Sequence, residues 1–221
     1  MWHAKPTYGY LSDSQEAIDN GLEFVTAMLG VGWTKEAAAA AWGNIGFESA
    51  YNPWRWESEV ILSVGDWRLY AYPENRSHGY GLVQFTPAIN YLENSDAMSL
   101  PGFAPNYADR AGNASDGAAQ TVFIDWFGGQ GQWFINPGYN YPLTWNEFKT
   151  STLTPEYLAA AWLHNYERPA DQSHAVEVVR GNEARYWYEL WGGVVPPGPT
   201  PTDKKFKLYL YGRNWQRRQR R

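Results

Sequence analysis

The chain has 221 residues, of which 44% are hydrophobic, so its length suits one substantial domain with a sizeable core. It contains no cysteine, which excludes a disulfide framework and catalysis by a thiolate. The formal net charge is −5, although residues 196–221 hold eight basic side chains and one acidic side chain. The rest of the chain is therefore strongly acidic, which argues against nucleic acid as the substrate.

Aromatic residues are unusually frequent, with 13 Trp, 16 Tyr and 9 Phe. Large aromatic side chains can fill a core, or they can line a cleft and stack against the apolar faces of sugar rings. Composition does not divide the aromatic residues between these two uses.

The first predicted helix lies near the start of the chain. Four apolar residues recur at helical spacing and predict its buried face: Ile18, Leu22, Val25 and Leu29. Ser12 and Gln15 can form a capping box at its start, and Gly30 with Gly32 can end it.

Thr34 can cap a second helix, over about residues 35–49. Its alanine run at 37–41 lets another element approach closely, so we expect this helix to be buried. It should end before the turn signal Asn52-Pro53. Residues 60–71 follow with a pattern that favours a small β hairpin.

Four further helices are expected to begin at these signals: Thr86-Pro87, Ser115, Thr144 with Glu147, and Thr154-Pro155. The helix after Ser115 should bury Val122, Phe123, Trp126 and Phe127. The glycine-rich residues 128–143 should be a loop, and the last long helix should run from about residue 171 to residue 191.

The segment 42–53 carries the first chemical signal. Glu48 falls in the last turn of the predicted buried helix, where burial and the helix dipole both favour the protonated carboxylic acid. A carboxyl group that keeps its proton can donate it to a leaving oxygen. A Glu at a helix end is usually an ordinary surface residue, but here small residues leave room for a ligand and aromatic residues crowd the same stretch.

The segment 78–85 carries the second signal, a tyrosine between two glycines. Gly79 and Gly81 allow a close backbone approach to a ligand, and Gln84 can both donate and accept hydrogen bonds. On its own, this segment could also be an ordinary glycine-rich turn.

Together, Glu48-Ser49 and the later Tyr80-Gly-Leu-Val-Gln84 resemble the Glu-Ser and Gly-Leu-x-Gln motifs of lytic transglycosylases and goose-type lysozymes. The chain is more similar still to the phage tail lysozyme family. Three segments carry that resemblance: Gly-Asn-Ile-x-x-Glu-Ser-x-x-Asn-Pro at 43–53, Gly-Tyr-Gly-Leu-x-Gln at 79–84 and Asn-Tyr-Glu-Arg-Pro at 165–169. The resemblance covers about residues 10–192.

The resemblance implies a lysozyme-like fold of the α+β class, mainly α, with a helical lobe, a small β wing and a sugar cleft between them. It also implies that Glu48 is the general acid. The residues that we expect to bind substrate are Ser49, Tyr51, Glu57, Tyr80, Gln84 and Tyr166.

No motif identifies a second catalytic carboxylate. The candidates in the expected wing are Glu57, Glu59, Asp66 and Glu74. Alternatively, the N-acetyl group or the 6-hydroxyl of the substrate supplies this function, so the product can be a hydrolysed end or an anhydro end. Glu167 and Arg168 could line the cleft, or they could form a structural ion pair.

The implied activity is that of a phage- or prophage-encoded muramidase or lytic transglycosylase. It would cut the β-1,4 bond between N-acetylmuramic acid and N-acetylglucosamine in peptidoglycan, without a cofactor. The alternative is a non-catalytic module that binds the cell wall or builds the phage tail tip. A peptidase is disfavoured, because cysteine is absent and the four histidines have no zinc-ligand spacing, so we expect no metal site.

The domain organisation predicted is a catalytic domain at 1–193, a Pro/Gly-rich linker at 194–202 and a short basic tail at 203–221. The tail could be disordered, or it could attach the chain to other phage tail proteins or to anionic wall polymers. Residues 1–9 lack the features of a signal peptide, and no apolar stretch suits membrane insertion. We therefore expect the protein to be carried on the virion or released from the host cell.

Overall fold

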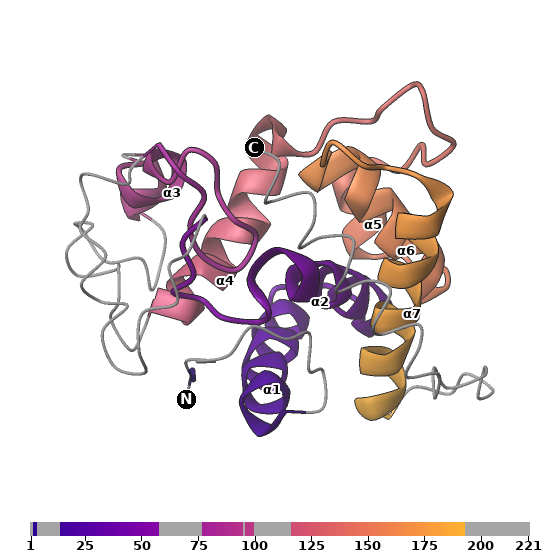
Figure 1. Cartoon of the computed structure of the whole chain (residues 1–221), viewed down its shortest axis with the longest axis horizontal. Coiled ribbons are helices and arrows are strands. Elements are labelled where there is room, and N and C mark those ends of the chain that lie inside the picture. Colours follow the sequence, from indigo (N-terminus) through magenta and orange to yellow (C-terminus); the bar gives the residue numbers. More distant parts are fainter. Residues whose placement is uncertain (1, 4–13, 58–76, 95, 100–115, 193–221) are drawn as a thin grey trace, which may run out of the picture.

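The computed structural model describes residues 2–3, 14–57, 77–94, 96–99 and 116–192 (Figure 1). Three predicted features lie outside the described residues: the hairpin at 60–71, the linker at 194–202 and the basic tail at 203–221. Their structures therefore stay predictions.

The described part of the chain is mainly helical, as expected. Within it, the β-type pairing consists of isolated bridges that join Tyr80 to Trp56 and to Phe85. The small β wing of the predicted α+β fold is thus untested. No described helix combines the length and the hydropathy that a membrane-spanning segment needs.

The first helix, α1 (Gln15–Gly30), ends at the predicted glycine. Ser14 caps its start by accepting a hydrogen bond from the Ala17 amide, a position that we had assigned to Ser12, which is not among the described residues. After the helix, Gly32 adopts a φ of +91°, a conformation that favours glycine.

The buried face of α1 differs from the predicted one. Its buried residues are Ala17, Asn20, Gly21, Phe24, Val25 and Met28. Leu22 and Leu29, which we had placed on this face, are 49% and 47% exposed. Both sets recur at helical spacing, so a tertiary contact decides between them. A Cβ atom at Gly21 would lie 2.8 Å from Nε1 of Trp42. The glycine therefore allows α1 to lie close to the second helix at this point.

That second helix, α2 (Lys35–Ser49), is capped by Thr34 as predicted, and its alanine run is fully buried. It lies at the centre of the molecule and packs against α1 on one side and against the C-terminal helices on the other (Figure 1). A Cβ atom at Gly43 would lie 2.6 Å from the backbone nitrogen of Ala184, so a glycine is needed where the last helix crosses α2.

The two short helices that follow residue 140 begin at their predicted caps. α5 (Trp145–Lys149) has the complete capping box of Thr144 and Glu147. α6 (Pro155–Trp162) is capped by the Thr154 side chain, which accepts a hydrogen bond from a backbone amide. Both predictions are confirmed.

Two π-helical turns interrupt this region. η4 (Gly128–Gln132) occupies the start of the stretch that we had predicted to be entirely loop. η5 (Leu163–Glu167) continues α6 and holds most of the Asn-Tyr-Glu-Arg-Pro segment. A π-helical turn is wider than an α-helical one and is frequent at functional sites. The last helix, α7 (His174–Leu190), begins later than expected, with Ser173 at its N-cap position.

The short helix α3 (Ile89–Leu92) also begins later than predicted, because Ala88 holds the N-cap position. The expected cap, Thr86, instead donates its hydroxyl hydrogen bond to the carbonyl of Gln84 at 2.8 Å. Thr86 is therefore used in the preceding turn. A 3-10 turn, η2 (Asp96–Ser99), follows.

The remaining long helix, α4 (Asp116–Phe127), lies beside α3 and crosses near the end of α1 (Figure 1). Phe123 is fully buried as predicted, and so is Ile124. The other three residues of the predicted face are only partly buried: Val122, Trp126 and Phe127.

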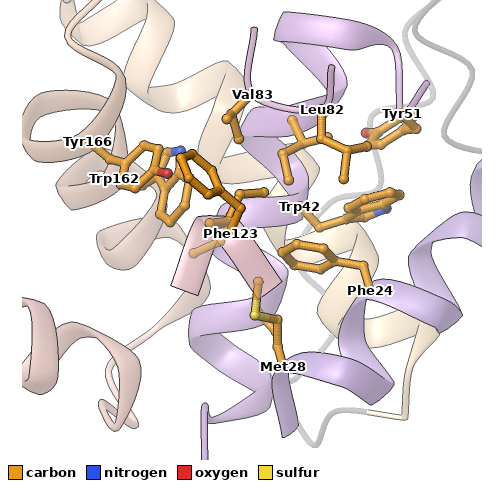
Figure 2. Packing of buried hydrophobic residues seen from close by; sticks show 14 of the residues in the cluster. Phe24, Met28, Trp42, Tyr51, Leu82, Val83, Phe123, Trp162 and Tyr166 are labelled. Carbon is orange, nitrogen blue, oxygen red and sulfur yellow. The ribbon is translucent and has the colours of Figure 1, made fainter. Parts of the chain in front are cut away.

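The core is built largely from aromatic side chains (Figure 2). Trp42 of α2 packs against Phe24 of α1 and against Tyr51, with 5.0 Å between ring centroids in both pairs. On the other side of α2, Trp162 stacks on Tyr166 with 4.0 Å between centroids. The C-terminal end of α2 is thus held rigidly between two aromatic clusters, and it carries the site described next.

Candidate active site

A cavity of about 300 Å³ lies between the C-terminal end of α2, the segment 83–90 and the turns η4 and η5. Its walls are formed by Glu48, Arg55, Trp56, Glu57, Val83, Gln84, Phe85, Thr86, Asn90, Phe127, Gln132, Tyr166, Glu167 and Pro169. Three carboxylates and four aromatic rings are among them. This combination suits a polar ligand with apolar faces, such as a sugar.

Glu48 lies in the last turn of α2 and lines this cavity. The helix ends one residue later, where Ala50 adopts a left-handed φ of 51° and donates its N–H to the carbonyl of Gly46. The Glu48 side chain is 23% exposed, so it is less buried than we had predicted. Its Oε1 accepts a hydrogen bond from Nη2 of Arg180 at 2.7 Å, which makes a cation its nearest charged neighbour.

Arg180 of α7 is buried, with only 7% of its side chain exposed. It links both sides of the site. Its Nη1 donates to Oδ1 of Asn44 at 2.9 Å and to a carboxylate oxygen of Glu167, while Nη2 donates to Glu48. Burial lowers the pKa of Arg180, but the charges of Glu167 and Glu48 raise it above its usual value overall. The guanidinium is therefore a permanent cation between two carboxyl groups.

Glu167 is the last residue of η5, and its side chain is 5% exposed. One carboxylate oxygen accepts a hydrogen bond from Nε1 of Trp162 at 2.8 Å, and the other accepts from Arg180. Burial raises the pKa of Glu167 to about 8; Arg180 opposes this rise and Glu48 adds to it. The cavity thus contains a carboxyl group that keeps its proton at neutral pH.

A second part of the wall comes from the glycine-flanked motif. Nε2 of Gln84 donates to the carbonyls of Arg55 and Gly81, both at 3.0 Å, which fixes the side chain in the wall. Oε2 of Glu57 accepts from the Gly79 amide at 2.8 Å. The two glycines therefore hold wall residues through their backbones, and the φ of +81° at Gly81 favours glycine there.

Tyr166 lines the cavity from η5 and is 2% exposed. Its hydroxyl is buried and has no hydrogen-bond partner among the described residues. Burial raises the pKa of Tyr166 well above its usual value, so the hydroxyl is neutral and can donate or accept a hydrogen bond. An unpaired buried hydroxyl costs about 1–3 kcal/mol, which a ligand group that pairs with it would recover.

Two of the residues that we predicted to bind substrate, one at the end of α2 and one just after it, are buried and do not line the cavity. The Ser49 hydroxyl donates to the carbonyl of Ile45 in its own helix, at 3.2 Å. The Tyr51 hydroxyl donates to Glu183 and accepts from Nε1 of Trp187 at 2.9 Å. Burial raises the pKa of Tyr51, and the Glu183 carboxylate beside it adds to this rise.

Tyr80 also lies behind the wall. It is 1% exposed, and its hydroxyl donates to the buried carboxylate of Asp116 at the start of α4. Tyr91 donates to the other oxygen of this carboxylate at 2.6 Å. These contacts fasten the glycine-flanked motif to α4, whereas the contribution of Tyr80 to substrate binding stays a prediction.

The candidates for a second carboxylate divide into two groups. Glu57 lines the cavity, whereas Glu59, Asp66 and Glu74 lie outside the described residues. Glu167, which we had considered as a cleft residue or as the ion-pair partner of Arg168, lines the cavity and pairs with Arg180 instead. In the part of the chain that the structure describes, no three His, Asp or Glu side chains group closely enough to hold a metal ion.

Arg180, the residue that joins the two carboxyl groups, was not predicted from the sequence. No motif surrounds it in the last helix. The available signal was the small residues Gly181 and Ala184, which lie near it on α7 and allow that helix to approach others closely. Such a signal predicts close helix packing, but it does not predict which polar residue the packing buries.

A mainly helical protein with a carboxylate-lined cavity fits several classes of protein, and comparison with known proteins identifies its family. Residues 19–191 match the model of the family described as phage tail lysozyme, and the chain therefore belongs to this family. It is also 33% identical over 194 residues to a protein named Morphogenesis protein 1, from Bacillus phage B103. That alignment covers 87% of this chain but 44% of the relative, so the chain spans less than half of the relative's length.

Proposed function

We propose that this protein cuts the glycan strands of bacterial peptidoglycan, at the β-1,4 bond between N-acetylmuramic acid and N-acetylglucosamine. Glu48 donates the proton to the glycosidic oxygen as the bond breaks. The observation that carries this proposal is the position of Glu48, on a rigid helix end in the wall of a cavity that also holds aromatic side chains.

The wall of the cavity suits the remaining steps of the reaction. Glu57 is the candidate for a second carboxylate that activates water or stabilises the positive charge that develops on the sugar ring. If Glu57 activates water, the product is a hydrolysed end. If the 6-hydroxyl of the substrate attacks instead, the product is a 1,6-anhydro end, as lytic transglycosylases make.

We further propose that the protein acts as part of a phage particle. Its relative's name refers to morphogenesis, which fits a component that is assembled into a virion. In this proposal residues 1–193 carry out catalysis, 194–202 form a linker, and the basic tail at 203–221 binds other tail proteins or anionic wall polymers.

A second candidate function has one observation in its favour. The name Morphogenesis protein 1 speaks of assembly and not of an enzyme. A structural tail module could keep the fold and use the cavity to bind the wall without cutting it. Such a module would not need the arrangement of Glu48, Glu167 and Arg180 around a cavity.

Purified peptidoglycan distinguishes these possibilities. The protein is incubated with walls free of other enzymes, and the released fragments are identified by mass spectrometry. Reducing N-acetylmuramic acid ends indicate a muramidase, and anhydro ends indicate a transglycosylase. Wall binding without new ends would support the structural module and reject the enzyme.

A further inference from the structure

One cation lies between two carboxyl groups in this site, and its position creates a chemical difficulty. Arg180 donates to Glu48 through Nη2 and to Glu167 through Nη1. A guanidinium next to a carboxyl group favours the ionised carboxylate. Glu48 must carry a proton to act as the general acid, so Arg180 alone would oppose the proposed function.

We infer that Glu167 is a positioning residue that resolves this difficulty: it binds Arg180 and shares one proton with Glu48, so that Glu48 can hold the proton while Glu167 neutralises the cation. This inference rests on the proposed function, because it explains how the proposed acid stays protonated. In the transfer, the proton leaves a Glu167 carboxyl oxygen for a Glu48 carboxyl oxygen, and the Glu167 carboxylate that remains pairs with Arg180.

The hydrogen bonds around Glu167 suit both of its protonation states. Trp162 donates to one oxygen at 2.8 Å and Arg180 donates to the other, so the carboxylate is stabilised after it gives up the proton. Before that, burial and the neighbouring Glu48 keep the proton on Glu167, whose pKa they raise to about 8. Both carboxyl groups bind the same guanidinium, and Glu48 is among the groups that raise the pKa of Glu167, so the two carboxyl groups lie side by side.

Other charged groups lie near the Glu48 and Glu167 carboxyl groups, but among the described residues Arg180 is the one that binds both of them. Glu48 comes from α2 and Arg180 from α7. Across the cavity, Arg55 and Glu57 bring one charge of each sign. Arg168 follows η5 and donates to backbone carbonyls, so its charge points away into a turn.

The unequal exposure of the two carboxyl groups explains why substrate would move the proton. The Glu48 side chain is 23% exposed and the Glu167 side chain is 5% exposed, so water favours the charge on Glu48 while the cavity is empty. A sugar that fills the cavity displaces this water. The advantage of a charged Glu48 is then lost, and the proton is better placed on Glu48, beside the bond to be cut.

The first test compares pH–rate profiles on purified peptidoglycan for the full-length wild type, Glu167→Gln and the double variant Glu167→Gln/Arg180→Gln. In Glu167→Gln, Arg180 has one anion left to pair with, so Glu48 should lose its proton at a lower pH than in the wild type. The basic limb of the kcat profile should move down by about one pH unit, the smaller end of a charge effect at this distance, with KM nearly unchanged.

The double variant removes the cation as well, and its basic limb should return close to that of the wild type. Glu156→Gln is the matched control, since Glu156 of α6 pairs with Arg185 of α7 away from the cavity, and its profile should not move. A wild-type profile in Glu167→Gln, or a shift that persists in the double variant, overturns the inference.

The second test uses the wild type alone, and so depends neither on the folding of variants nor on activity. Carboxyl carbons of the ¹³C-labelled protein are followed by NMR from pH 4 to pH 10. We expect one glutamate carboxyl that keeps its proton past neutrality and titrates near pH 8. If every carboxyl is ionised by pH 6, no shared proton exists and the inference is wrong. If this titration is found but peptidoglycan stays intact, the proposed function fails while the shared proton remains.

Discussion

Two buried carboxyl groups in this protein, those of Asp116 and Glu167, have very different surroundings. Asp116 is fully buried and accepts hydrogen bonds from the hydroxyls of Tyr80 and Tyr91, both of which are also buried. Glu167 is buried to a similar degree, but it lines a cavity and shares a guanidinium with Glu48.

The difference shows that burial of a carboxyl group is not sufficient to indicate a catalytic function. Around Asp116, both tyrosines donate at once, each to its own carboxylate oxygen, and the cluster fastens α4 to the neighbouring turn. Around Arg180, the carboxyl groups of Glu48 and Glu167 compete for one cation. Burial raises the pKa of Glu167. Competition of this kind shifts a pKa toward the value that a proton-transferring group needs.

The largest effect is expected at Glu48. Glu48→Gln removes the proton donor and keeps an oxygen that can accept from Arg180, so the fold should be unaffected. We expect the rate of fragment release from purified walls to fall roughly 100-fold or more, the scale of general acid catalysis. The melting temperature serves as the control, and a variant with undiminished activity would reject Glu48 as the acid.

A smaller effect, on stability and not on catalysis, is expected in the Asp116 cluster. Tyr80→Phe leaves a buried carboxylate with one donor fewer, which should lower the free energy of unfolding by about 1–3 kcal/mol. Activity per folded molecule should stay within about twofold of the wild type, because Tyr80 lies behind the wall. Denaturant unfolding and wall digestion measure the two quantities. Unchanged stability with weaker substrate binding would instead support the contact with substrate that the sequence motif predicts.

The sequence predicted the helices wherever a local signal decides their start. The side chains of Thr34, Thr144 and Thr154 each cap the expected helix, because a cap needs only the next few residues. It failed where a distant contact decides. Leu22 was predicted to be buried together with Val25, but only Val25 is buried, because the close approach of Trp42 at Gly21 turns a neighbouring face of the helix inward.

The same limit applies to the site. Glu48, Gln84 and Tyr166 were found from short motifs, and all three line the cavity. Ser49 follows Glu48 directly, but consecutive residues on an α-helix point about 100° apart, so one faces the cavity and the other faces the core. Arg180 could not be found in this way, because its function depends on the tertiary packing of α7 against α2.

The smallest effect is expected at Tyr166, and Tyr51 provides a matched comparison. Both are buried tyrosines that we predicted to bind substrate. The Tyr51 hydroxyl pairs with Glu183 and Trp187, whereas the Tyr166 hydroxyl has no partner in the described part of the chain and belongs to a residue that lines the cavity. Tyr166→Phe should therefore leave the melting temperature unchanged or slightly raised, since it removes an unpaired buried polar atom.

If the Tyr166 hydroxyl pairs with substrate, the loss of one hydrogen bond of about 1 kcal/mol should weaken oligosaccharide binding about fivefold. Tyr51→Phe should do the reverse, because it leaves the Glu183 carboxylate and the Trp187 indole without the hydroxyl between them. It should lower the melting temperature and leave binding unchanged. Calorimetric titration with a soluble N-acetylglucosamine oligomer and thermal unfolding of both variants measure the two effects. Equal affinities in the wild type and Tyr166→Phe would mean that this hydroxyl does not contact the sugar, and that Tyr166 contributes only its ring to the wall.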